Sequence, residues 1–96
     1  MDIDPYFDRT EIDNRLSITV MIKEFERVIL TEDIPGTELR KGDVGVVVEI
    51  YNEGEGYEVE FFALNGDTVA VETLESRQVR SATNREILHV RELNAT

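Results

Sequence analysis

Short apolar runs separated by turn residues make up the middle of the chain. Runs rich in β-branched and aromatic residues occupy residues 27–31, 44–51, 57–63 and 68–74, and each predicts a β-strand. Glycine, proline, asparagine and aspartate lie between these runs, as is typical of turns. Residues 75–80 predict a short 3₁₀ turn that leads into a closing strand at 78–80. The pattern predicts an all-β fold, a small SH3-like barrel of about five antiparallel strands.

The two ends of the chain are less regular. Residues 1–20 lack a clear period and are rich in turn formers, which predicts an N-terminal extension before a barrel of residues 21–83. Residues 84–96 predict a short C-terminal tail. Its apolar residues are Ile87, Leu88, Val90 and Leu93. They fit one helical side only loosely, and strand alternation fails because the first two are adjacent. An extended segment and a short helix packed on the barrel therefore both remain open.

The hairpin at Asn65-Gly66 allows two registers. A two-residue loop would pair Phe61 with Ala70, whereas a three-residue loop of residues 64–66 would pair Phe61 with Val69. The three-residue loop places Gly66 in the left-handed region, as the glycine of a bulge. It also collects a coherent apolar inner face, made of Tyr57, Val59, Phe61, Ala63, Val69, Val71 and Thr73. We therefore predict the three-residue loop, because a slip by one residue would destroy that face.

The same register defines an outer face that carries negative charge. We expect residues 44, 46, 48 and 50 to point inward, which leaves Gly45, Val47, Glu49 and Tyr51 outside. The predicted partner-binding residues are Glu49, Glu58, Glu60, Phe62 and Glu72. Carboxylates around an apolar centre suit a basic protein partner. The same charges can also serve only solubility or protection of a sheet edge.

The charge balance narrows the class of partner. The chain has 96 residues, with 21 acidic and 10 basic side chains and a formal net charge of −11. Such a surface disfavours nucleic acid, because polyanions are bound through basic contacts that release counterions. The hydrophobic fraction of 41% is enough for one core. Without an apolar run long enough to span a bilayer, we expect a cytoplasmic protein that does not bind membranes.

Groups suited to catalysis are few. The chain has no cysteine and one histidine, His89, which lies in the predicted tail without an accompanying nucleophile motif. The strand glutamates do not form a loop like those that bind calcium. Glu53-Gly-Glu-Gly56 is too short and too acidic to hold a phosphate. We therefore expect no enzymatic activity, no catalytic residue, no metal and no cofactor.

Several segments, taken in order, resemble one protein family. They are Phe25-Glu-Arg-Val-Ile-Leu-Thr-Glu-Asp33, Leu39-Arg-Lys-Gly-Asp-Val-Gly-Val-Val48, Gly56-Tyr-Glu-Val-Glu-Phe61, Asn65-Gly-Asp-Thr-Val-Ala-Val-Glu-Thr-Leu74 and Gln78-Val-Arg80. Together they look like the bacterial Domain of Unknown Function 4926 family, over about residues 21–93. The resemblance implies a small SH3-like barrel without an established activity. It also implies a place in gene pairs that resemble toxin–antitoxin modules.

A second resemblance is shorter. Residues 41–48 look like the KOW motif of ribosomal and transcription-factor barrels, but only Arg40 and Lys41 are basic at this turn. The sequence therefore favours a non-catalytic acidic protein-binding module, an antitoxin or immunity-type partner that masks a basic protein such as a toxin. Two alternatives stay open. One is a KOW-like nucleic-acid-associated accessory domain, and the other is a self-associating structural protein, a homo-oligomer that uses edge strands and residues 1–20.

Overall fold

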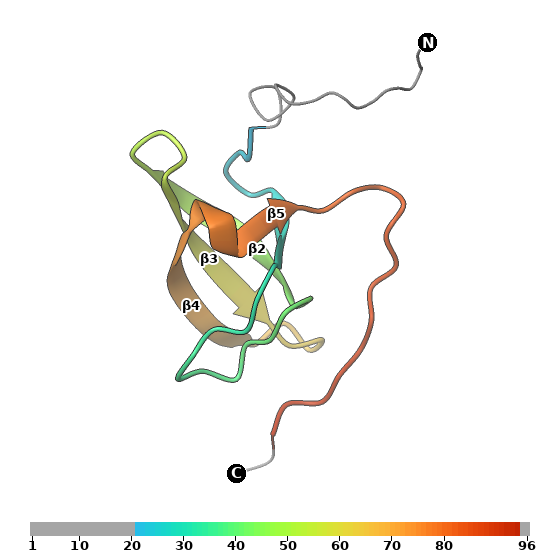
Figure 1. Cartoon of the computed structure of the whole chain (residues 1–96). Coiled ribbons are helices and arrows are strands. Elements are labelled where there is room, and N and C mark those ends of the chain that lie inside the picture. Colours follow the sequence, from blue (N-terminus) through green and yellow to red (C-terminus); the bar gives the residue numbers. More distant parts are fainter. Residues whose placement is uncertain (1–20, 95–96) are drawn as a thin grey trace.

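The computed structural model describes residues 21–94, which form one five-stranded antiparallel sheet (Figure 1). The strands are β1 (Arg27–Leu30), β2 (Val44–Tyr51), β3 (Gly56–Phe62), β4 (Thr68–Glu75) and β5 (Val79–Ser81), and the 3₁₀ helix η3 (Ser76–Gln78) joins the last two. Their order in the sheet is β4-β3-β2-β1-β5. The all-β prediction is confirmed, including the 3₁₀ turn before the closing strand. Residues 1–20, the predicted extension, lie outside the described residues.

The sheet has the strand order of the predicted SH3-like barrel but does not close. Among residues 21–94 no ladder joins β4 to β5, so each of them forms an edge. The chain crosses between these edges through η3, where Gln78 Oε1 accepts a hydrogen bond from the Glu75 backbone N–H at 2.9 Å. The Ser76 backbone N–H also donates to the Glu55 carbonyl at 3.2 Å. These contacts hold the turn against the neighbouring β2–β3 connection.

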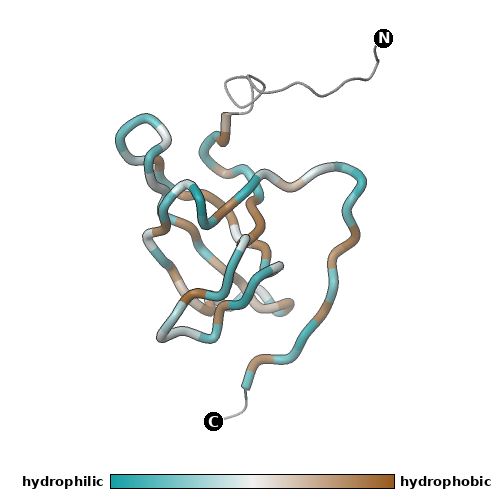
Figure 2. Tube along the Cα trace, in the orientation of Figure 1, coloured by the Kyte–Doolittle hydropathy of each residue, from teal (hydrophilic) through white to brown (hydrophobic). Residues whose placement is uncertain are grey.

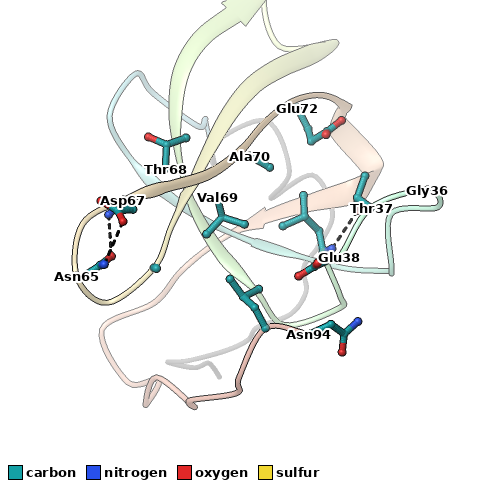
Figure 3. Close-up of a pocket in the computed structure, with 13 residues that line it drawn as sticks. Gly36, Thr37, Glu38, Asn65, Asp67, Thr68, Val69, Ala70, Glu72 and Asn94 are labelled. Carbon is teal, nitrogen blue, oxygen red and sulfur yellow. Dashed lines mark hydrogen bonds between the residues drawn. The ribbon is translucent and has the colours of Figure 1, made fainter. Parts of the chain in front are cut away.

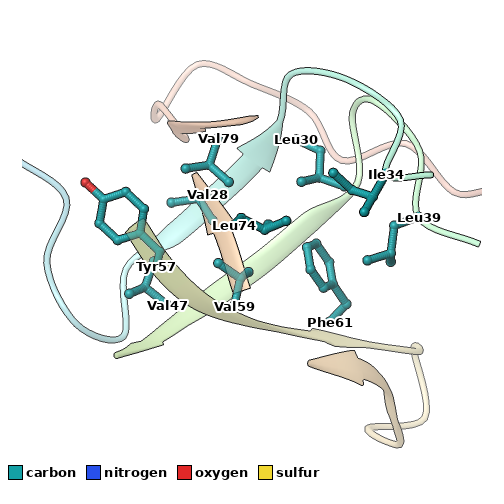
Figure 4. Packing of buried hydrophobic residues seen from close by; sticks show 10 residues of the cluster. All are labelled: Val28, Leu30, Ile34, Leu39, Val47, Tyr57, Val59, Phe61, Leu74 and Val79. Carbon is teal, nitrogen blue, oxygen red and sulfur yellow. The ribbon is translucent and has the colours of Figure 1, made fainter. Parts of the chain in front are cut away.

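The core lies on the inner face of the curved sheet (Figure 4). Its members are Val28, Leu30, Ile34, Leu39, Val47, Tyr57, Val59, Phe61, Leu74 and Val79. Figure 2 shows the hydrophobic positions recurring along the strands. Full burial of a valine or leucine side chain contributes about 1.5–3 kcal/mol, so this layer is the main source of stability. Ile34 and Leu39 come from the long β1–β2 loop and cover one end of the core.

The predicted facing of β2 is wrong in its first half. Val47 pairs with Val59 and is fully buried, and Gly45 pairs with the buried Phe61. The register shifts between Val47 and Glu49, which marks a β-bulge. An extra residue at a bulge reverses the alternation of side chains, so Glu49 and Tyr51 still point outward as predicted. Val47 therefore belongs to the core and not to the outer surface.

The hairpin prediction is correct at the turn and wrong beyond it. The Ala63 N–H donates to the Asp67 carbonyl at 2.9 Å, and Gly66 has a φ of +94°, as a three-residue loop requires. A register shift then follows, so that Phe61 pairs with Ala70 instead of Val69. This second bulge also reverses the facing of β4.

The reversal exchanges the inner and outer residues of β4. Leu74 pairs with Tyr57 in the core, and Glu72 pairs with the buried Val59 on the inner face. Val71 and Thr73, predicted to point inward, lie on the outer face and are exposed. The second bulge thus removes one predicted glutamate from the outer face and places a valine there.

The tail is extended, and it is not helical. No strand or helix is present in residues 82–94. It leaves β5 and arcs away from the sheet (Figure 1). Ile87 is 93% exposed, and Leu88 and Val90 are each 71% exposed, so these residues do not pack on the barrel. Of the two alternatives, the extended segment is confirmed.

In the described part of the chain, no helix is long and apolar enough to cross a membrane.

The close packing at Gly45 generates a first prediction. A Cβ atom there would lie 2.5 Å from Val59 Cγ1 and 2.8 Å from Phe61 Cε2. Gly45→Ala should therefore destabilise the fold by about 1–3 kcal/mol through overpacking, measured by chemical unfolding. Gly56→Ala is the matched control, because its Cβ would meet only the Leu74 carbonyl, at 3.3 Å. Equal losses in the two variants would contradict this account of β2.

Candidate functional site

Charge is distributed unevenly over the sheet. The strands β2, β3 and β4 carry five glutamates and no lysine, arginine or histidine. In contrast, β1 carries Arg27 and β5 carries Arg80. One half of the sheet therefore has a single sign of charge, which creates a negative field over that half.

The outer side of this half brings glutamates and apolar side chains together. We define the acidic face as Glu49, Glu58, Glu60, Phe62 and Val71. Glu49 on β2 pairs directly with Glu58 on β3. Glu60 on β3 lies between Val46 on β2 and Val71 on β4. Phe62 is 46% exposed and Val71 is 47% exposed, which is unusual for large apolar side chains on adjacent strands. Four of the five predicted site residues thus share one surface.

Hydroxyl groups hold two of these carboxylates in place. Glu58 Oε1 accepts hydrogen bonds from Thr73 Oγ1 at 2.6 Å and from the Tyr51 hydroxyl at 3.1 Å. Thr68 Oγ1 donates to Glu60 Oε2 at 2.5 Å. The hydrogen bond to Glu58, followed by partial desolvation and nearby negative charge, raises the pKa of Tyr51 above its ordinary value. The tyrosine therefore stays protonated and keeps donating.

These hydrogen bonds fix the direction of the Glu58 and Glu60 carboxylates without neutralising their negative charge. Within residues 21–94, the ion pairs are Arg77–Glu32, Arg77–Glu75, Arg80–Glu86 and Arg91–Asp43. None of them involves a carboxylate of the acidic face. Glu58 and Glu60 are half-buried, so their charges are less well solvated than those of free side chains. The acidic face consequently offers oriented acceptors, and no basic side chain among residues 21–94 pairs with them.

Glu72 lies apart from the acidic face. It lines a cleft of about 580 Å³ between residues 36–39, the β3–β4 hairpin, β4 and the end of the tail (Figure 3). Val69, Ala70 and Leu93 contribute apolar surface to the same cleft. Its predicted place on the outer face is wrong, because the bulge in β4 turns its side chain to the inner side. The outer-face residue that the sequence analysis missed is Val71, which lies opposite Glu60, where the predicted register would put Ala70.

Two arginine clasps fix the tail to the barrel. Arg91 Nε donates to Asp43 Oδ1 at 2.8 Å, and Arg91 Nη2 donates to Asp43 Oδ2 and to the Glu38 carbonyl, each at 2.6 Å. Arg80 Nη2 donates to Glu86 Oε2 at 2.6 Å. A bidentate arginine–carboxylate pair has a defined geometry, so the first clasp sets the position of the tail end. No local sequence pattern reveals this pair, because 48 residues separate its members.

The clasps shift the pKa values of their carboxylates. Burial acts to raise the pKa of Asp43, but hydrogen bonds from Arg91 and the Arg40 backbone, with the charges of both arginines, lower it overall. The hydrogen bond from Arg80, with that from the Thr83 backbone, lowers the pKa of Glu86 from 4.5 to about 2. A carboxylate whose pKa is lowered by folding stabilises the folded state at any pH above the pKa that it has in the unfolded chain. This contribution is lost as the pH falls through the lower, folded-state pKa.

Among residues 21–94, no group of three or more histidine, cysteine, aspartate or glutamate side chains is placed to hold a metal ion. His89 lies in the exposed tail. The expectation of a non-catalytic protein without cofactor stays a prediction.

A second prediction follows from the Arg80–Glu86 clasp. The Glu86 side-chain carboxyl should titrate with a midpoint near 2, well below 4.5, when followed by carbon-detected NMR. Arg80→Gln should return the midpoint toward the ordinary value, because it removes the positive charge. In Arg77→Gln, the control, the Glu86 titration should stay unchanged, since Arg77 pairs with Glu32 and Glu75. A midpoint near 4.5 in the unaltered protein would show that the clasp does not persist in solution.

Comparison with known proteins places this fold in a family. Neither a curated protein nor a solved structure matches the chain. One family model, described as Domain of unknown function (DUF4926), matches residues 24–81, which run from just before β1 to the end of β5. Because that match covers more than half of the chain and the whole sheet, the chain belongs to the Domain of unknown function (DUF4926) family.

Proposed function

We propose that the protein is a non-catalytic binding module whose acidic face docks on a basic protein. In its most concrete form, it is an antitoxin or immunity-type partner that masks a functional basic surface. The observation that carries the proposal is the pairing of oriented carboxylates, which form no ion pair within residues 21–94, with exposed Phe62 and Val71 on one side of β2, β3 and β4. A partner for this surface would present lysine or arginine around an apolar pocket.

The physics assigns different roles to the two kinds of side chain. Charges at the rim of an interface act mainly on the rate of encounter and on its dependence on salt. An aromatic side chain that becomes desolvated at the centre acts mainly on the lifetime of the complex. Glu58 and Glu60 belong to the first kind and Phe62 to the second. Hydroxyl partners reduce the entropy that the two glutamates lose on binding, because they already restrict the carboxylates.

The nucleic-acid alternative has less support from the geometry. Arg40, one of two basic residues at the KOW-like turn, donates from Nη1 to the Thr37 and Leu39 carbonyls at 2.9 and 3.0 Å. Its guanidinium is thus engaged in shaping the β1–β2 loop. Exposed Lys41 alone provides a small basic surface next to strands of opposite charge.

A capture experiment tests the proposal with a third prediction. The tagged full chain, used on an extract of its source cell, should retain a basic protein that Glu58→Gln/Glu60→Gln fails to retain. Glutamine keeps an acceptor oxygen for the Thr68 and Thr73 hydroxyls, so this variant should fold normally. Glu53→Gln/Glu55→Gln is the matched control, because it removes the same charge from the exposed β2–β3 turn. Retention of nucleic acid only, or of the same proteins by all variants, would overturn the proposal.

The binding kinetics of the identified partner give a fourth prediction. Glu58→Gln/Glu60→Gln should slow association about tenfold and flatten its salt dependence. Phe62→Ala should leave association nearly unchanged and speed dissociation roughly thirtyfold, as loss of about 2 kcal/mol implies. Leu64→Ala is the control for loss of an exposed apolar side chain, since Leu64 lies in the turn outside the acidic face. Equal effects of Phe62→Ala and Leu64→Ala would contradict a central role for Phe62.

A further inference from the structure

The tail contains a segment with unused capacity for strand pairing. We define the arm as residues 85–91. Within residues 21–94, no backbone group of residues 87–94 takes part in a backbone–backbone hydrogen bond. The arm also exposes Ile87, Leu88 and Val90, two of which are β-branched. Figure 2 shows hydrophobic positions along a tail that stands away from the sheet. Exposed apolar residues on an extended, unpaired backbone are the features of a strand that lacks its neighbour.

The clasps keep this segment extended. Glu86 near the start of the arm is bound to Arg80, and Arg91 at its end is bound to Asp43. A strand that is already extended loses less conformational entropy when it pairs. The Arg80 clasp also neutralises Glu86, which is the one carboxylate within the arm. The arm therefore keeps the positive charge of Arg85.

An unpaired strand edge is available on β4. This strand has eight residues and pairs only with β3 among the described elements. It carries Glu72 and Glu75 and no basic residue. The cleft along its inner side is lined by Val69 and Ala70, and it already receives Leu93 from the tail. The β4 edge thus combines backbone groups that are unpaired within residues 21–94, negative charge and an apolar surface. Leu93 of the tail contacts that apolar surface.

We propose that the arm adds as a strand to the β4 edge of a second copy of the chain, and that two copies exchange arms. Main-chain hydrogen bonds would supply the affinity, as in other cases of strand addition. Leu88 and Val90 share one side of an extended arm and would lie over the cleft, whereas Ile87 would lie near Val71 on the outer side. Exchange of both arms closes a two-fold dimer, which leaves neither arm exposed.

A second copy is required because of where the arm starts. The arm follows β5, which forms the edge of the sheet opposite to β4. Both clasps hold it to residues of its own chain, at Arg80 in β5 and at Asp43 before β2. While these contacts remain, Glu86 and Arg91 stay beside β5 and the β1–β2 loop, and only Leu93, which lies beyond the arm, reaches the cleft beside β4 of the same chain. The proposal does not depend on the carboxylates of the acidic face, because the arm would contact only Val71 of that face.

Sedimentation of the full chain over a range of concentrations tests the proposal. The unaltered protein should form a dimer, and either Leu88→Pro or His89→Pro should weaken it about tenfold or more. Successive N–H groups of a strand point to opposite edges, so at least one of these variants must remove a pairing hydrogen bond. Asn84→Pro is the control and should leave the dimer intact, because Asn84 lies before the arm and its backbone N–H makes no hydrogen bond within residues 21–94. Glu58→Gln/Glu60→Gln should also keep the dimer.

Paramagnetic NMR then locates the arm. The chain has no cysteine, so a nitroxide on Glu92→Cys in unlabelled protein can be mixed with ¹⁵N-labelled, unmodified protein. Amide signals of residues 69–73 should broaden, whereas a nitroxide on Glu53→Cys should leave them sharp. A monomer at all concentrations would overturn the proposal. So would a dimer insensitive to both arm prolines, or broadening that spares β4.

Discussion

The reversal of side-chain direction within β2 is the constraint on which the rest of the structure depends. Val47 and Glu49 are two residues apart, so regular alternation would place both on the same side of the sheet. Either the valine would be exposed or the carboxylate would enter the core, and burial of an unpaired charge is costly. The bulge between them places Val47 in the core and Glu49 outside. It thereby allows one strand to contribute to the core and to the acidic face.

Gly45 shows how closely the strands approach before this bulge. It points inward, where Val59 and Phe61 already fill the space that a side chain would need. Gly45 pairs with Phe61, and Val47 pairs with Val59. Both partners belong to β3, in which the side chains alternate regularly between the two faces from Tyr57 to Phe61. Because β3 is the central strand of the β2–β3–β4 half, its regular alternation determines which residues of both neighbours point inward.

The sequence predicted the elements well and the facing of β2 and β4 poorly. β-branched runs and turn residues are local signals, and they located all five strands, the three-residue turn at Gly66 and the 3₁₀ turn. A bulge has no such signal, because it depends on which residue of a partner strand lies opposite. Because β3 itself alternates regularly, the sequence places its residues Glu58, Glu60 and Phe62 on the correct face. Val47, Val71 and Glu72, which lie beyond or beside a bulge, were assigned to the wrong side.

The arrangement of ion pairs explains why the net charge alone says little about function. Arg77, Arg80 and Arg91 each pair with a carboxylate of the same chain. Exposed pairs of this kind contribute little to stability, but they engage these arginines away from the glutamates of β3. Glu58 and Glu60 are bound by hydroxyl groups instead, and no basic side chain among residues 21–94 pairs with them.

The two proposed surfaces share only Val71. The acidic face uses side chains that point outward from β2, β3 and β4, whereas strand addition would use the backbone edge of β4. Strand addition leaves the outward direction of Glu58, Glu60 and Phe62 unchanged, because those residues lie on β3. A dimer built through the arms would therefore present two acidic faces. Two such faces in one assembly would raise the avidity for a partner that is itself a dimer, without any new contact.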